Sequence, residues 1–429
     1  MTAAAQSAQH RIYTRQSVSW ALFDFSTTVF AMNVISRFAA LWIKNEKGGT
    51  DLDFAWAIVA SLVAASAVNV VLAPLSDALG LRAAFVRLFA LVCGAATAAL
   101  GANPTLSLAL ALIALANFAN QSGAIFWTAM LGDVSTPRSL GRISGLGAAL
   151  SYIGSVTGLM LVERLRDERA SAAVVFVPTA VVYVLFALPQ FLLVRDRQPH
   201  VGGINVAATL RSTWGELVAI GRLIWNRRPL RWLMLAVLLY SDVLGTLTLF
   251  MAVYAQEAIG MDEQDKVFLW LTEISVYLIA ATVFAVLGGW LIGKLADRLN
   301  KLRLLMSLLA LWTAGLLIAI LTRAKWPFWI AGPMIGLAWG GVAVLGRALL
   351  LELGWPEHRT KLFTIFALVG RAAGIIGPFL WGAVVTAAEP LGHDKYRVAA
   401  GTLAVLMLLA MWTLRKAMRE QKVVHGSEN

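Results

Sequence analysis

Long apolar runs are the feature of this chain that most limits how it can fold. A helix needs about 20 apolar residues to cross the hydrocarbon core of a bilayer. The runs do not alternate as barrel strands would, so helices are the expected spanning element. Twelve such runs occur, at 17–43, 54–75, 84–102, 105–131, 140–162, 172–194, 230–256, 267–292, 303–322, 327–352, 361–387 and 396–415. The sequence therefore predicts an all-α membrane protein with twelve transmembrane helices.

The composition agrees with a membrane protein. Of the 429 residues, 59% are hydrophobic and 14% are charged, whereas a soluble chain is about half apolar and a quarter charged. The single cysteine, Cys93, lies inside an apolar run, which excludes a disulfide within the chain. We expect Cys93 to be a small core side chain.

The basic residues predict the orientation of the chain. The net charge is +12, and most of the 36 lysine and arginine residues fall in loops on the side of the N-terminus. Basic loops mark the cytoplasmic side. We therefore expect a multi-pass protein of the cell inner membrane with both termini in the cytoplasm. This placement also explains the positive charge without a nucleic acid partner.

One long polar connection divides the chain into halves. It predicts a six-helix bundle over 1–194, a cytoplasmic linker over 195–229 and a second six-helix bundle over 230–429. Apolar residues of the linker recur at helical spacing, which favours an amphipathic helix on the membrane surface; a plain linker is the alternative. These residues are Leu210, Trp214, Leu217, Val218, Gly221, Ile224 and Trp225.

The two halves form an internal repeat. Four landmarks of the first half recur in the second at offsets of 218 to 220 residues: Asp24 and Asp242, Asp77 and Asp297, Pro137 and Pro356, and Gly154 and Gly374. Two parallel six-helix repeats, with a binding site between them near mid-bilayer, are a known transporter plan.

A short loop motif points to one family. The segment GKLADRLNKLR at 293–303 resembles the signature of the major facilitator superfamily, and APLSDALGLRAAFVR at 73–87 is a degraded first copy with Ala78 in place of a basic residue. The resemblance implies the fold of that superfamily. A glycine permits close backbone approach, and the charged residues can cap helices or anchor to the membrane face. We expect gating roles for Asp77, Arg82, Gly293, Asp297, Arg298 and, at the end of span 10, Arg347.

A closer resemblance covers most of the chain. The segments WALFDFSTTVF (20–30), LLYSDVLGTL (238–247) and 336–382 resemble the autophagy-related vacuolar amino-acid effluxer family and its bacterial relatives. Ser26-Thr27-Thr28 and Val243 depart from the pattern of that family. The resemblance implies export of small polar metabolites such as amino acids.

Charged residues inside the apolar runs are the main candidates for a substrate site. A charge at bilayer depth costs at least about 2.5–3.5 kcal/mol, so it indicates a function. We expect Asp242 and Arg371 to face a central cavity, where Arg371 could hold a carboxylate or phosphate. Asp242 could bind an ammonium group or exchange a proton. The alternative is a salt bridge between the two.

The remaining candidates are less specific. Asp24 could bind substrate or a proton; the alternatives are a partner for the Arg347 region or a cytoplasmic gate. Glu273 lies nearer the outer end of span 8. Polar side chains in a span can also join helices, and this alternative applies to Asn120, Gln121 and Tyr240.

The sequence favours a transporter over other classes of protein. All five histidines lie in loops or tails, and no metal set, ATP-binding loop or catalytic motif is evident, which predicts no enzyme, no metal and no cofactor. We expect a monomeric secondary transporter of a small solute, working by alternating access. The coupling ion is expected to be the proton, because buried carboxylates can bind one. The alternative is a non-transporting membrane assembly or sensory protein on the same scaffold.

Overall fold

The computed structural model describes residues 13–136, 139–165, 171–196, 215, 218–262, 266–296, 298–354 and 359–426. Within these residues, twelve helices are long and apolar enough to cross a membrane. This confirms the prediction of twelve spans. The first of them, Arg15–Asn45, consists of three consecutive elements.

The chain divides into two compact units. Unit 1 holds Met1–Ala39 with Val63–Leu210, and unit 2 holds Ala40–Leu62 with Arg211–Asn429. The sequence predicted boundaries at 194 and 230. It did not predict that residues 40–62 group with the second unit.

Unit 1 contains the first-half helices, apart from the segment just named. Its elements are α2 (Arg15–Phe30), the π-helix η1 (Ala31–Phe38), the second part of α4 (Asp51–Leu79), α5 (Arg82–Leu100), α6 (Leu106–Ala129), α7 (Leu131–Val134), α8 (Leu140–Leu165), η2 (Ala172–Val175) and α9 (Phe176–Leu193).

Unit 2 contains the second-half helices together with α3 (Ala39–Asn45) and the first part of α4. Its other elements are α11 (Arg228–Glu257), strands β1 (Lys266–Phe268) and β2 (Leu271–Thr272), α12 (Glu273–Ala296), α13 (Lys301–Leu321), α14 (Lys325–Leu353), α15 (Arg359–Ala387), η4 (Glu389–Asp394) and α16 (Lys395–Gly426).

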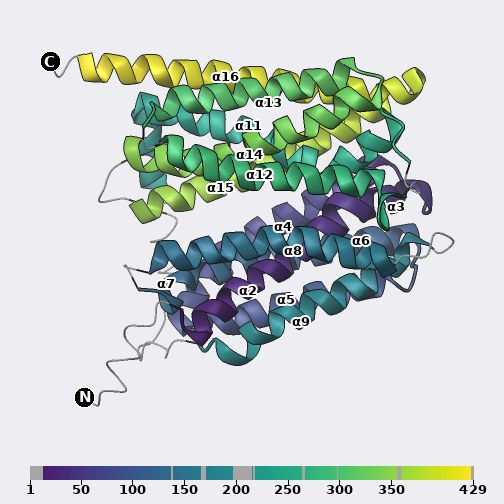
Figure 1. Ribbon diagram of the computed structural model, residues 1–429. Helices are drawn as coiled ribbons and strands as arrows, with labels where there is room; N and C mark the ends of the chain where they lie inside the picture. The colour runs from purple at the N-terminus through teal and green to yellow at the C-terminus, as the bar shows by residue number, and fades with distance from the viewer. Residues whose placement is uncertain are drawn as a thin grey trace. The chain divides into compact units, whose positions relative to one another are not determined.

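The two units pair their helices in the same way (Figure 1). In unit 1, α2 packs against α8 and α9, and α5 packs against α6 and α9. In unit 2, α11 packs against α15 and α16, and α13 packs against α14 and α16. These four pairings join helices at equivalent positions of the sequence repeat.

Polar side chains define several helix starts. Thr14 and Ser17 form a capping box before α2, in which the Thr14 hydroxyl accepts the Ser17 N–H at 3.1 Å. The Asn300 side chain accepts the Arg303 N–H at 3.0 Å before α13. These contacts satisfy N–H groups that a helix start leaves unpaired.

The closest helix contact in unit 2 joins α12 to α14. A Cβ added at Gly340 would lie 1.8 Å from the carbonyl oxygen of Ala285, and one at Gly336 would lie 2.1 Å from that of Ala281. Only glycine permits the two backbones to approach this closely, which is a common device in membrane helix packing.

Two expected boundaries differ from the structure. Span 8 was expected to begin at 267, but a two-stranded antiparallel hairpin occupies this segment and α12 begins at Glu273. In the linker, residues 218–226 are helical, with Ile220 and Ile224 buried. The expected apolar positions Leu210, Trp214 and Leu217 lie outside the described residues.

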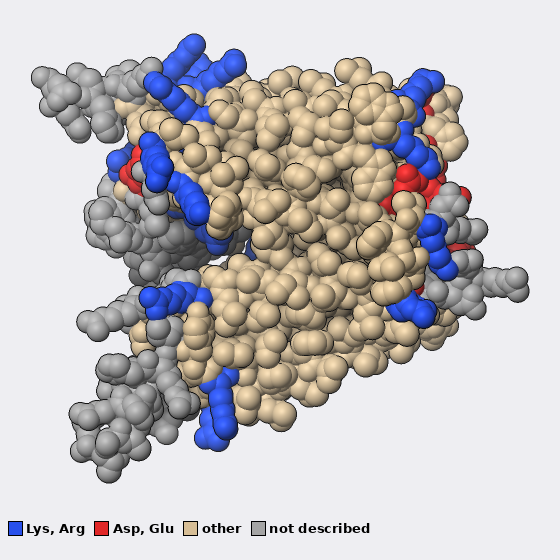
Figure 2. Space-filling view, viewed as in Figure 1, with Lys and Arg blue, Asp and Glu red and all other residues tan. Residues whose placement is uncertain are grey.

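The described surface is largely apolar between the helix ends. Lys and Arg side chains visible in Figure 2 gather mainly near the ends of the helices. Large apolar side chains are exposed along the spans, for example Val181 on α9 and Leu408 on α16. This pattern is typical of helices that face lipid.

Candidate functional site

Asp242 forms the centre of the candidate site in unit 2. It lies near the middle of α11, and its side chain is buried, with 3% of the residue exposed. Oδ1 of Asp242 accepts a hydrogen bond from the backbone N–H of Gly377 on α15 at 2.7 Å. Among the described residues, the carboxylate therefore receives a main-chain donor rather than a cation.

Gly377 is small enough to make this contact. A Cβ added there would lie 2.8 Å from Oδ2 of Asp242 and 2.1 Å from the hydroxyl oxygen of Thr246. The Thr246 hydroxyl in turn donates to the backbone carbonyl of Asp242 at 2.8 Å. Asp242 was predicted from the sequence as a candidate, but its partner Gly377 was not.

Arg371 lies six residues before Gly377 on α15, about 9 Å along the helix axis. Its side chain is half-buried. Among the described residues, no ion pair or hydrogen bond holds the guanidinium, and none joins it to Asp242. The alternative of an Asp242–Arg371 salt bridge is thus not the arrangement in this structure.

The structure separates Tyr240 from Asp242. Tyr240 is buried, and its hydroxyl faces α14, where a Cβ added at Gly346 would lie 2.9 Å from it. Asp242 instead faces α15. Residues two apart on a helix point about 200° apart, so these two side chains lie on different sides of α11.

Glu273 has a cationic partner in unit 2. Oε2 of Glu273 lies 2.6 Å from Nζ of Lys325, and Trp329 donates its indole N–H to Oε1 at 3.5 Å. These contacts join the first turns of α12 and α14. They provide a structural role for Glu273, and its expected part in binding stays a prediction.

Asp24 is the candidate of unit 1. It lies half-buried on α2, and its Oδ1 accepts from the Thr27 hydroxyl at 3.4 Å. A Cβ added at Gly147 of α8 would lie 3.6 Å from its Oδ2. Among the residues that the structure describes, no cation pairs with Asp24. Thr28, one of the residues that depart from the effluxer pattern, donates to the Ser151 carbonyl of α8 at 2.8 Å.

Other polar side chains of unit 1 lie on α6. Asn120 and Gln121 are half-buried, and within the described part of the chain Oδ1 of Asn120 has no hydrogen-bond partner. Two residues on, Ser122 accepts from Nδ2 of Asn69 on α4 at 3.1 Å. Asn69 was not predicted from the sequence, although an amide inside an apolar run was the available signal.

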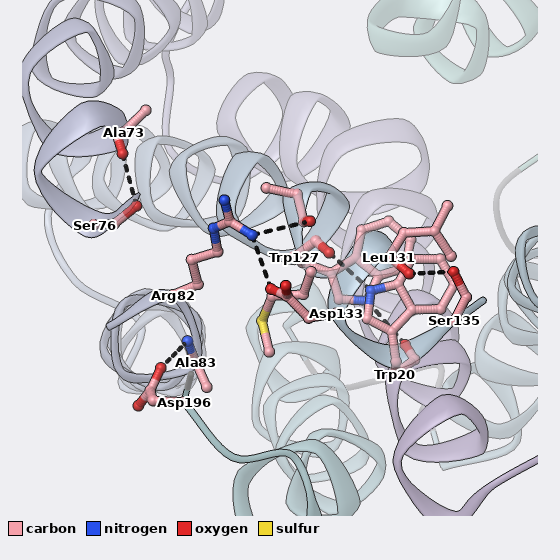
Figure 3. Close-up of polar contacts among 12 residues, drawn as sticks. Trp20, Ala73, Ser76, Arg82, Ala83, Trp127, Leu131, Asp133, Ser135 and Asp196 are labelled. Carbon is pink, nitrogen blue, oxygen red and sulfur yellow. Dashed lines mark hydrogen bonds and ion pairs between the residues drawn. The ribbon is translucent and has the colours of Figure 1, made fainter. Parts of the chain in front are cut away.

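The expected gating residues of the first copy occupy one end of unit 1. Nη1 of Arg82 lies 2.8 Å from Oδ2 of Asp133, next to a stack of Trp20 and Trp127 (Figure 3). Nearby, Oδ1 of Asp196 accepts the Ala83 N–H at the start of α5 at 2.6 Å. Asp133 and Asp196 were not predicted. The Asp77 side chain lies outside the described part of the chain.

Among the described residues, the expected gating residues of the second half make few polar contacts. Nε of Arg347 donates to the Ala343 carbonyl of its own helix at 3.1 Å. The backbone N–H of Arg298 donates to Leu295 at 3.0 Å. Among the described residues, a Cβ at Gly293 would meet nothing within 4 Å, so no close backbone approach between them requires a glycine there. Asp297 lies outside the described residues.

A fully buried ion pair was also missed. Nη2 of Arg37 lies 3.4 Å from Oε1 of Glu163, and the two side chains are 0% and 2% exposed. Arg37 belongs to the π-helix η1 and Glu163 to α8. π-Helical turns are rare and frequently lie at functional sites.

Polar contacts join the segment 40–62 to the rest of unit 2. Nζ of Lys44 lies 2.6 Å from Oε1 of Glu257 at the end of α11, and it also contacts the Tyr396 hydroxyl. Tyr396 donates to Oδ2 of Asp51 at 3.0 Å. Nδ2 of Asn45 donates to Oε1 of Gln256 at 3.3 Å.

The fold and these sites define a twelve-span helical membrane protein with two similar units. The family model of the Major Facilitator Superfamily matches residues 23–353 and 271–428. The chain belongs to this superfamily, and it is a membrane transporter that binds a small-molecule substrate within the membrane.

The similar proteins are transporters or autophagy-related proteins. The uncharacterized MFS-type transporter YxiO of Bacillus subtilis is 24% identical over 424 residues, covering 93% of this chain and 94% of YxiO. Autophagy-related protein 22 of Coccidioides immitis is 21% identical over 295 residues, covering 62% of this chain. The chain spans about half the length of this fungal relative, 47% of it.

Solved structures share the fold. A mutant of the nucleoside transporter NupG has a TM-score of 0.77 at 11% identity, covering 94% of this chain and 99% of NupG. A bacterial homolog of the human lysosomal transporter Spinster has a TM-score of 0.70 at 14% identity, covering 95% of this chain and 97% of that one.

Proposed function

We propose that the chain is a proton-coupled secondary transporter that exports a small polar, amino-acid-like solute by alternating access. The observation that carries this proposal is the environment of Asp242. Its buried carboxylate accepts one main-chain N–H and, among the described residues, is not paired with a cation. A carboxylate at membrane depth is costly, and neutralisation by a proton or by the ammonium group of a solute removes this cost.

Arg371 supports the choice of substrate class. It is a half-buried guanidinium that pairs with none of the described residues, on the helix that also contacts Asp242. A guanidinium binds a carboxylate through two parallel hydrogen bonds. A zwitterion such as an amino acid has both groups that Asp242 and Arg371 would recognise. The resemblance to the amino-acid effluxers agrees with this substrate class.

The alternative of a non-transporting protein is less well supported. It predicts that Asp242 and Arg371 neutralise each other, and no contact among the described residues joins them. We further propose that the monomer is the working unit, located in the cell inner membrane with cytoplasmic termini.

Transport into liposomes tests the proposal. Purified protein is reconstituted, and uptake of a panel of radiolabelled amino acids is measured with and without an imposed pH gradient. We expect Asp242→Asn to abolish uptake driven by the pH gradient, and Arg371→Gln to abolish both driven uptake and exchange. Asp394→Asn and Arg323→Gln, which remove exposed charges of unit 2, are the matched controls.

The assay separates coupling from binding. If Asp242→Asn retains solute exchange across the membrane, Asp242 carries the proton; if exchange is lost as well, Asp242 contacts the solute. Uptake by both variants at the level of the controls would refute the proposed site. Absence of movement for every amino acid would refute the substrate class.

A further inference from the structure

A patch of aromatic and basic side chains lies on unit 2, away from the candidate substrate site. Arg231 in the first turn of α11 is flanked by two indole rings. Its guanidinium carbon lies 5.3 Å from the ring centre of Trp225 and 5.4 Å from that of Trp232. Nη1 of Arg231 also donates to the Trp225 carbonyl at 3.5 Å. Among the described residues, this is the one hydrogen bond from the guanidinium, so its other N–H groups stay available there.

The patch continues onto α16, which packs beside α11 (Figure 1). The rings of Trp232 and Trp412 lie 5.6 Å apart at 86°, in an edge-to-face contact. Nζ of Lys416 lies 5.4 Å from the ring centre of Trp412. We call these five residues, Trp225, Arg231, Trp232, Trp412 and Lys416, the indole patch.

The charge around the indole patch is positive. Arg222, Arg415 and Arg419 are exposed and lie close to the patch in the sequence. The Glu420 carboxylate forms an ion pair with Arg228 at 3.6 Å. Within the described residues, neither Arg231 nor Lys416 has a carboxylate partner. A ring face attracts a cation but leaves its N–H donors unfilled. The patch therefore offers donors and positive charge to an anion.

An exposed apolar stripe leads to these cations. Val405, Leu408, Trp412 and Lys416 recur on one face of α16, and the first three are 55%, 54% and 50% exposed. Such a face, apolar along the span and basic at its end, suits a lipid whose acyl chain follows the helix. Free phosphate would bind the cations but would not cover the apolar stripe.

We propose that the indole patch and the adjoining stripe of α16 bind one anionic phospholipid, with its phosphate between Arg231 and Lys416 and an acyl chain along Leu408 and Val405. This site is independent of the proposed transport function, because it shares no residue with the Asp242 site.

Lipid binding to the purified full chain tests the proposal. Native mass spectrometry measures the affinity for dioleoylphosphatidylglycerol, dioleoylphosphatidylcholine and inorganic phosphate. We expect phosphatidylglycerol to bind about tenfold more tightly than phosphatidylcholine, since each basic residue near an anionic lipid strengthens binding severalfold. The variant Arg231→Gln/Lys416→Gln is expected to lose this preference.

A control variant removes two positive charges at the opposite helix ends of unit 2. Arg323→Gln/Lys395→Gln is expected to keep the preference, because these cations pair with Asp394 and Glu389. Equal binding of the two lipids by the wild type would overturn the proposal. Binding of inorganic phosphate as tight as that of phosphatidylglycerol would overturn it too. The comparison of the two lipids on the wild-type protein tests the proposal even if the double variant does not fold.

Discussion

Trp20 and Trp127 form a reciprocal pair that joins α2 to α6. Their indole rings stack at 4.4 Å with an interplanar angle of 8° (Figure 3). Each indole N–H donates to the backbone carbonyl of the other residue at 2.8 Å. Both indole donors are thus satisfied by one contact across 107 residues of chain.

We predict that this pair stabilises unit 1. Trp127→Ala should lower the free energy of unfolding by about 3 kcal/mol, because it removes a packed indole and leaves a cavity. Trp127→Phe should cost about 1 kcal/mol, because a ring remains but one hydrogen bond is lost. Unfolding in mixed detergent micelles, followed by circular dichroism, measures both values. Trp326→Ala, at a 71% exposed position, is the control, and an equal loss in that variant would contradict the prediction.

Two glycines of α15 provide a matched test of the Asp242 contact. A Cβ at Gly377 would clash with Thr246 and Asp242, whereas a Cβ at Gly370 would meet none of the described residues within 4 Å. We predict that Gly377→Ala reduces transport at least about tenfold, since the helices must shift or Asp242 must lose its donor. Gly370→Ala should transport as the wild type does. Similar rates for the two variants in liposomes would show that the Asp242–Gly377 contact is dispensable.

The buried Arg37–Glu163 pair predicts an asymmetric response to mutation. Arg37→Met should lower the free energy of unfolding by about 3–5 kcal/mol, because it removes the cation that lies 3.4 Å from a buried carboxylate. The double variant Arg37→Met/Glu163→Gln should recover part of this loss, since neither side chain is then charged. Thermal unfolding in detergent compares the three proteins. A double variant less stable than Arg37→Met would contradict this account.

We predict that a reversible crosslink at the segment 40–62 stops transport. The chain on either side of this segment belongs to unit 1, while Asn45 contacts Gln256 of unit 2. If the segment separates from α11 during transport, a short cleavable thiol crosslinker between Asn45→Cys and Gln256→Cys should reduce uptake at least about tenfold. Cleavage of the crosslinker should restore uptake. The native Cys93 is buried, and each single cysteine variant is the control. Full uptake by the crosslinked protein would rule out this movement.

Much of the architecture could be predicted from local properties of the chain. The twelve spans follow from apolar length, because each helix in lipid must satisfy its own backbone hydrogen bonds whatever its neighbours are. The segment before Glu273 was assigned to a span incorrectly, because Val267, Phe268 and Leu269 are apolar yet form an exposed hairpin. Hydropathy alone does not distinguish such a turn from the end of a helix.

The sequence alone also determined that Asp242, Arg371 and Asp24 are unusual, because a charge within an apolar run is costly wherever it points. Only the tertiary structure decided their partners. Asp242 receives a donor 135 residues away, Glu273 pairs with Lys325, and Arg371 pairs with none of the residues that the structure describes. These partners depend on how each helix is rotated about its axis and on the angle at which it crosses its neighbours. Both are determined by packing between distant segments of the chain, not by local composition.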